Sequence, residues 1–359
     1  MPAARAVSSL PRHLTVAYGL LIVYACLHPL TGWKPTGLPL LDFLDAPWPK
    51  YYRVADLVLN VLGFLPFGFV LAPALPLRIG RVGAVIASTL IAGLLSFGME
   101  VTQNFLPTRV SSNVDLGCNL LGAFAGALLG ARWGHPLFDE SGWLHRWRSM
   151  RIIPGHLGDL GLMLLGLWLL AQVTPDRVLF GSGDLRQLLG LPTPLQFEPE
   201  RFILLETTLV AITLLGVGLF ARCMMRGASP WPIALLLLLG LGAKTLATAS
   251  FFQPGAPLLW LTPGTQQGLL FGLPLLAGAL LLPRLLQHTL AGVALLAATS
   301  LTNLLPENPY FQVGHRMLQQ GNFLNFHGLT QLSANLWPFL ALAYLSAVGL
   351  WRGEHLTKR

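Results

Sequence analysis

Long apolar runs recur along the whole chain, and they constrain its fold more than any other feature. A transmembrane helix needs roughly 20 consecutive, mostly apolar residues. Ten segments approach that length, at residues 14–30, 55–75, 82–104, 113–131, 157–173, 202–221, 231–250, 264–282, 286–305 and 334–351. The sequence therefore predicts an all-α, polytopic integral membrane protein with about ten transmembrane helices.

The composition argues against most other classes of protein. Of the residues, 53% are hydrophobic and only 11% are charged, whereas a soluble domain carries about 25% charged residues. The net charge of +8 comes without a basic stretch interleaved with aromatic residues, so we expect no nucleic-acid partner. Cys26, Cys118 and Cys223 lack metal-ligand spacing, and no cofactor fingerprint occurs. We expect no metal and no cofactor, and membrane lipids as partners.

The distribution of Lys and Arg predicts the orientation. With the N-terminus in the cytoplasm, every predicted cytoplasmic segment carries at least one Lys or Arg, as the positive-inside rule requires. The longest loops, 31–54, 174–200 and 306–333, then lie outside and are rich in Pro, Gly and aromatic residues. We interpret the first apolar run as a retained helix, because no small-x-small cleavage site accompanies it. Both termini are predicted to be cytoplasmic.

Polar residues gather near the predicted outer ends of three helices. Each pair is three or four residues apart and so shares a helix face: Asp56 with Asn60, Glu100 with Gln103, and Asp115 with Asn119. Gly122, Gly126 and Gly130 continue the last pair as an extended GxxxG pattern, which lets helices approach closely. We therefore expect these polar side chains to face other helices. With Arg109, they form the candidate ligand-binding set: Asp56, Asn60, Glu100, Gln103, Arg109, Asp115 and Asn119.

The polar set has a functional and a structural interpretation. An Asp at mid-bilayer costs roughly 2.5–3.5 kcal/mol, so such groups lie inward, in pairs, or at functional sites. The structural alternative is that Ser112 and Asp115 form a capping box. Asp56 would then only occupy a first helical turn, where the helix dipole favours a carboxylate. In that alternative Arg109 pairs with Glu100 across the turn. The residues by themselves leave both interpretations open.

The C-terminal half carries fainter polar signals. Lys244 falls near the middle of the predicted helix 231–250 and needs a partner. Glu206, near the outer end of its own helix, is the candidate. A path for a transported solute and ordinary packing polarity are the two alternatives for this pair.

The spacing of the N-terminal motifs resembles that of the VanZ-like family. The matching elements, in chain order, are Asp56, Asn60, Gly63-Phe64, Pro66-Phe67-Gly68, Glu100-x-x-Gln103, Pro107-x-Arg109, Ser112-x-x-Asp115 and Asn119-x-x-Gly122. The resemblance covers roughly residues 10–135. It implies a VanZ-like four-helix membrane domain at 1–135. Beyond the resemblance, the basic residues and the remaining apolar runs predict a basic cytoplasmic linker at 136–156 and an additional six-helix membrane region at 157–359.

The resemblance also implies a place in the bacterial cytoplasmic membrane and a link to glycopeptide resistance of the teicoplanin type. We expect an outward-facing polar pocket that binds a polar or lipid-linked envelope molecule, such as an envelope precursor. An intramembrane enzyme, with Glu100 or Asp115 as general base, and a transporter are the alternatives. The chain holds no HExxH, P-loop, GxSxG or dinucleotide fingerprint, which favours a protein that is not an enzyme.

Overall fold

The computed structural model describes residues 9–35, 37, 39–47, 53–139, 142–174, 177–252, 255–306 and 322–357. Among these residues there is no strand, and Ile152 and Met225 form an isolated bridge. A helix occupies each of the ten predicted segments: α1 (Leu10–Leu27), α2 (Val54–Ala74), α3 (Gly80–Gln103), α4 (Asn113–Phe138), α6 (Gly155–Ala171), α8 (Pro199–Met224), α9 (Trp231–Ala247), α10 (Pro263–Ala279), α11 (Arg284–Leu304) and α13 (Asn322–Thr357). The all-α polytopic membrane fold is confirmed.

The connections contain further short helical elements. They are η1 (Asp42–Leu44), η2 (Leu77–Ile79), α5 (Trp143–Arg151), α7 (Leu185–Leu189) and the π-helical turn η3 (Thr248–Phe252). Within the described part of the chain, eight helices are long and apolar enough to span a membrane. The two remaining candidates, α6 and α10, have 17 residues each, so ten crossings stay a prediction, as does the orientation.

Several helix ends differ from the predicted bounds, and two of the differences have distinct physical reasons. The first helix ends at Leu27 and not at residue 30, because a residue before proline disfavours helical backbone and His28 precedes Pro29. The last helix begins at Asn322, well before the apolar run that starts at residue 334. Polar residues there extend the helix without contributing to hydropathy.

The chain forms two compact units. The N-terminal unit comprises Met1–Met150 and Gln320–Leu329, and the C-terminal unit comprises Arg151–Gln319 and Thr330–Arg359. Helix α13 therefore begins in the N-terminal unit and continues in the C-terminal one. The predicted linker at 136–156 contains the end of α4 and all of α5.

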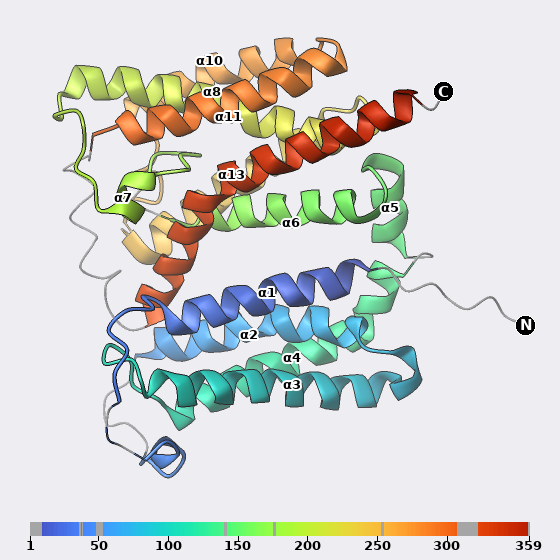
Figure 1. Cartoon of the computed structure of the whole chain (residues 1–359), viewed down its shortest axis with the longest axis vertical. Helices are drawn as coiled ribbons and strands as arrows, with labels where there is room; N and C mark the ends of the chain where they lie inside the picture. Colours follow the sequence, from blue (N-terminus) through green and yellow to red (C-terminus); the bar gives the residue numbers. More distant parts are fainter. Residues whose placement is uncertain are drawn as a thin grey trace, which may run out of the picture. The chain divides into compact units, whose positions relative to one another are not determined.

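In the N-terminal unit, α1, α2, α3 and α4 lie side by side, and α4 packs most extensively along α2 (Figure 1). Glycines make that approach possible. A Cβ on Gly122 would lie 2.2 Å from the Val61 carbonyl oxygen, and one on Gly126 would lie 1.9 Å from that of Leu65. Real Cβ atoms do not come so close, so α4 needs glycine at both positions. The GxxxG prediction thus describes the α2–α4 contact.

In the C-terminal unit, α8 is the central helix, and α10 and α11 pack against it (Figure 1). Aromatic side chains fill the core elsewhere in this unit. Trp168 and Trp337 are fully buried, and their ring centroids are 6.4 Å apart. The Trp337 indole N–H donates to the Leu164 carbonyl at 2.8 Å, which holds α13 against α6.

Candidate functional site

Glu100 joins the end of α3 to the start of α4. Its side chain is 3% exposed, and its Oε2 accepts a hydrogen bond from the Ser112 main-chain N–H at 2.9 Å. The Ser111 hydroxyl donates to the Glu100 carbonyl at 2.6 Å. The carboxylate therefore fixes the connection that precedes α4.

Asp115 does not complete the capping box that its spacing suggests. Ser112 is the N-cap residue of α4, and its hydroxyl oxygen accepts from the Asp115 N–H at 3.3 Å. In a reciprocal capping box the third residue's side chain would accept from the N-cap N–H. Glu100 occupies that N–H instead. The cap by Ser112 is confirmed, and the Asp115 carboxylate has a different environment.

The Asp115 carboxylate lies beside polar residues of α2. It interacts with the Asn60 side chain and electrostatically with Asp56. It also interacts electrostatically with Glu100. Asp56, Asn60 and Asp115 are half-buried, whereas Glu100 is buried. The structure thus brings four of the seven predicted residues together where α2 and α4 begin and α3 ends.

Asn119 continues this face one turn further along α4. Its side-chain amide donates to the Ser96 hydroxyl of α3 at 2.9 Å, and the residue is 5% exposed. Its Oδ1 is buried and has no hydrogen-bond partner among the described residues. A buried acceptor without a partner is rare and calls for an explanation, such as a bound group that donates to it.

Gln103 and Arg109 face a different neighbour, the end of α1. The Gln103 amide donates to the Cys26 carbonyl at 2.9 Å, and the Arg109 guanidinium donates through Nε to the His28 carbonyl at 3.0 Å. A second Arg109 nitrogen, Nη2, contacts the same oxygen. The pairing of Arg109 with Glu100, which the sequence left open, is therefore not the contact that Arg109 makes.

The resulting centre is rich in hydrogen-bond acceptors. Asp56, Glu100 and Asp115 contribute carboxylate oxygens, and Asn119 contributes an amide oxygen. Such a set recognises groups that donate hydrogen bonds, namely hydroxyl groups and amines. The carboxylates also repel one another, so a donor-rich or cationic group would lower their mutual energy.

Residues 16–134 match the family model described as VanZ/LLP1. The N-terminal third of this chain is VanZ-like. The matched residues contain all seven candidate positions, helices α2 and α3 and most of α4, whereas the C-terminal unit lies outside the match. No curated protein and no solved structure matches the chain.

The expected pair of Lys244 and Glu206 is not the arrangement in the C-terminal unit. The Lys244 ammonium donates to the main-chain carbonyls of Thr174 and Arg177, both at 2.6 Å. The Glu206 carboxylate accepts from the hydroxyl groups of Thr262 at 2.7 Å and Thr265 at 3.2 Å. Each buried charge is therefore stabilised by local groups. The two carbonyls that bind Lys244 belong to the irregular segment before α7. A pattern of apolar residues in the sequence does not predict main-chain partners of this kind.

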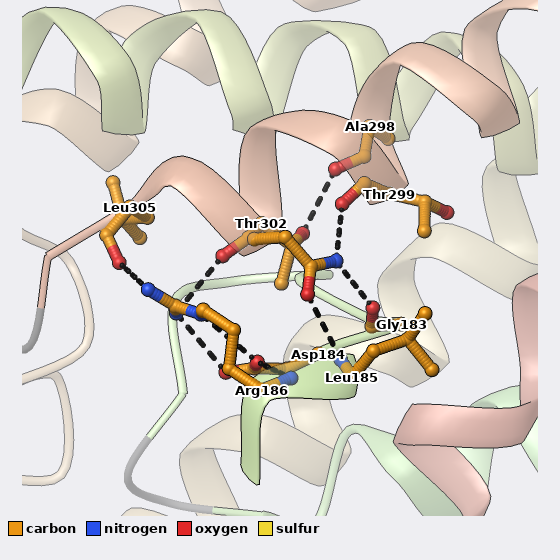
Figure 2. Close-up of polar contacts among 9 residues, drawn as sticks. Gly183, Asp184, Leu185, Arg186, Ala298, Thr299, Thr302 and Leu305 are labelled. Atoms are coloured by element: carbon orange, nitrogen blue, oxygen red, sulfur yellow. Dashed lines mark hydrogen bonds and ion pairs between the residues drawn. The ribbon is translucent and has the colours of Figure 1, made fainter. Parts of the chain in front are cut away.

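A second polar cluster in this unit holds the segment before α7 against the end of α11. Figure 2 shows the Arg186 side chain directed at this end, where it donates to the carbonyls of Thr302 at 3.2 Å and Leu305 at 2.9 Å. Asp184 pairs with the same guanidinium at 3.2 Å. Asn303 donates to the Gly183 carbonyl at 2.7 Å. These contacts satisfy carbonyl groups that a helix end leaves without partners, so we assign the cluster a structural role.

Sequence reasoning missed two contributors to the VanZ-like site. Ser96 and His28 were not among the candidates, although Ser96 lies on the same stripe of α3 as Glu100. The spacing of Ser96 and Glu100 is the signal that would have found it. His28 takes part through its main-chain oxygen, for which the sequence carries no signal.

Proposed function

We propose that the N-terminal unit, which contains the VanZ-like residues 16–134 and is called the VanZ-like unit below, binds a polar or lipid-linked molecule of the bacterial cell envelope. One observation carries this proposal: Glu100, and not Asp115, holds the Ser112 N–H. The Asp115 carboxylate is thereby left facing Asn60 and Asp56. Capping alone would explain Asp115 only if its side chain accepted that hydrogen bond.

The acceptors define the chemistry of the ligand. Carboxylate and amide oxygens from Asp56, Asp115 and Asn119 favour a headgroup with several hydroxyl groups or with an amine. The site is formed at the ends of apolar helices, at the start of α2 and α4. A headgroup held there would leave an attached acyl or prenyl chain beside the apolar helix surfaces. This combination favours a lipid-linked molecule.

The distribution of Lys and Arg supports the location that we propose for this site. With both termini in the cytoplasm, the ends of α2, α3 and α4 that carry the polar residues face the outer side of the cytoplasmic membrane. A site on that side is accessible to a precursor that is being built into the cell envelope. A role in glycopeptide resistance of the teicoplanin type would follow if the bound molecule were such a precursor.

The polar residues of the C-terminal unit give the transporter alternative no support. Lys244 and Glu206 each bind local partners, which lie on different elements. The two side chains therefore do not mark one continuous path for a transported solute. The enzyme alternative makes a distinct prediction, because the bound molecule would leave the site chemically altered.

Native mass spectrometry of the protein purified in a mild detergent tests the proposal. Wild type should retain a donor-rich lipid-linked molecule, and Asp115→Asn should retain at least about tenfold less, as expected for loss of hydrogen bonds to a charged group. Asp45→Asn, which changes an exposed carboxylate of the same unit, is the matched control and should behave as wild type. Equal retention by Asp115→Asn, or only bulk phospholipid on wild type, would overturn the proposal.

A further inference from the structure

The end of α1 is held by two of the candidate residues. Gln103 donates to the Cys26 carbonyl at 2.9 Å, and Arg109 donates to the His28 carbonyl at 3.0 Å. These carbonyl oxygens lie at the C-terminal end of α1, where the helix offers no main-chain N–H to bind them. The position of His28 therefore sets the position of Arg109.

Arg109 links the end of α1 to the α3–α4 connection, which leads to the polar centre. Its main-chain N–H donates to the Leu106 carbonyl at 2.9 Å, within the connection from α3 to α4. Three residues later in the same connection, Ser112 donates to Glu100. A displacement of His28 would thus move the connection whose geometry leaves Asp115 facing α2.

The His28 ring is itself packed against the start of α13. A Cβ on Gly328 would lie 2.4 Å from Cδ2 of His28, so an alanine there would displace the His28 ring. On the other side, the Tyr24 hydroxyl lies 3.1 Å from Nδ1 of His28. Gly328 is distant in sequence, yet Gln320–Leu329 belongs to the N-terminal unit. A segment outside the VanZ/LLP1 match therefore packs on a residue inside it.

We propose that His28 is a positioning residue of the VanZ-like site, through which the first turns of α13 set the placement of Arg109 and the α3–α4 connection. The proposal rests on the proposed function, since it assigns these residues to the same ligand site. It adds that the site is complete only when the start of α13 is in contact with His28. The C-terminal segment is then part of the binding unit.

The groups around His28 make the contact sensitive to pH. They are the Tyr24 hydroxyl on α1, the Arg109 guanidinium in the connection and His327 on α13. Burial lowers the pKa of His28, and the nearby Arg109 and then His327 lower it further. The folded unit thus favours neutral His28. Its contribution to stability is present above the ordinary pKa of about 6.5 and is lost as the pH falls from there toward the lowered pKa.

Hydrogen–deuterium exchange of residues 105–112 in the full chain tests the proposal, with rates corrected for the intrinsic pH dependence of exchange. At pH 8, Gly328→Ala should speed exchange there roughly tenfold, the change expected when a hydrogen-bonded contact is lost. Gly98→Ala is the control, because a Cβ at Gly98 meets no atom within 4 Å, and it should exchange as wild type.

The pH profile separates positioning from simple packing. Wild type should exchange faster at pH 5 than at pH 8, whereas His28→Gln, which is neutral throughout, should show no such step. Unchanged exchange in Gly328→Ala, or a step that persists in His28→Gln, would overturn the inference. If Gly328→Ala fails to fold, the profile of His28→Gln decides. If native mass spectrometry finds no lipid-linked molecule on wild type, the proposed function is contradicted, whereas the exchange of residues 105–112 still tests the role of His28.

Discussion

Replacing Glu100 tests whether its carboxyl group, and not that of Asp115, accepts the hydrogen bond from the N–H of the N-cap residue Ser112. Glu100→Ala leaves the Ser112 N–H, now bonded at 2.9 Å, without its acceptor. An unsatisfied buried N–H costs about 1–3 kcal/mol. Because Ser112 is half-buried, water relieves part of this cost, and we expect a loss of about 1–2 kcal/mol.

Glu100→Gln keeps an oxygen that can accept the hydrogen bond from the Ser112 N–H. A hydrogen bond to a neutral amide oxygen contributes about 0.5–1.5 kcal/mol, so most of the stabilisation by Glu100 is retained. Glu100→Gln should therefore be less than about 1 kcal/mol below wild type in unfolding free energy, and clearly more stable than Glu100→Ala.

Equilibrium unfolding by sodium dodecyl sulfate in mixed micelles, followed by circular dichroism, measures these differences. Asp45→Ala, at an exposed carboxylate of the same unit, is the control and should match wild type. If Glu100→Ala unfolds with the same free energy as this control, or as Glu100→Gln, Glu100 is not the acceptor that holds α4. The reasoning about Asp115 would then fail with it.

Three further predictions concern the fold. Gly126→Ala should reduce the yield of folded protein, because its Cβ would lie 1.9 Å from the Leu65 carbonyl oxygen, whereas Gly117→Ala meets no atom within 4 Å and should fold normally; equal yields on size-exclusion chromatography would contradict the α2–α4 packing. Lys244→Met should lower the thermal midpoint in detergent by leaving two buried carbonyl groups without a donor, at about 1–3 kcal/mol in total; an unchanged midpoint would refute this role. Reporter fusions at Ser141 and Ser182 should report opposite sides of the membrane, and the same side for both would refute the predicted topology.

Apolar run length was sufficient to predict the helices, because a spanning helix must satisfy its main-chain groups internally. Spacing was sufficient to place Asp115 and Asn119 on the face that packs against α2 and α3. The acceptor of the Ser112 N–H was not predictable, because Ser112 and Asp115 have the spacing of a capping box whichever carboxylate accepts from that N–H. The choice depends on where the end of α3 places Glu100, which is a tertiary contact.

Contacts to main-chain atoms also escaped sequence reasoning. Arg109 binds a carbonyl oxygen at the end of α1, and Lys244 binds carbonyl oxygens of the segment before α7. Neither binds the carboxylate that charge pairing suggested. Any residue offers such an oxygen, so no side-chain pattern marks it. The start of α13 was missed for a related reason, since its polar residues lie outside the hydropathy window that defined the helix.

The central claim is that a donor-rich envelope molecule occupies the face formed by Asp56, Asn60 and Asp115. A photo-crosslinking amino acid at Leu57, half-buried beside Asp56, tests it most directly in intact cells when compared with one at Val82, which is 75% exposed on α3. Mass spectrometry of the adducts should identify one lipid-linked, hydroxyl- or amine-rich molecule at position 57 and ordinary phospholipid at position 82. The same phospholipid adducts at both positions would contradict the account.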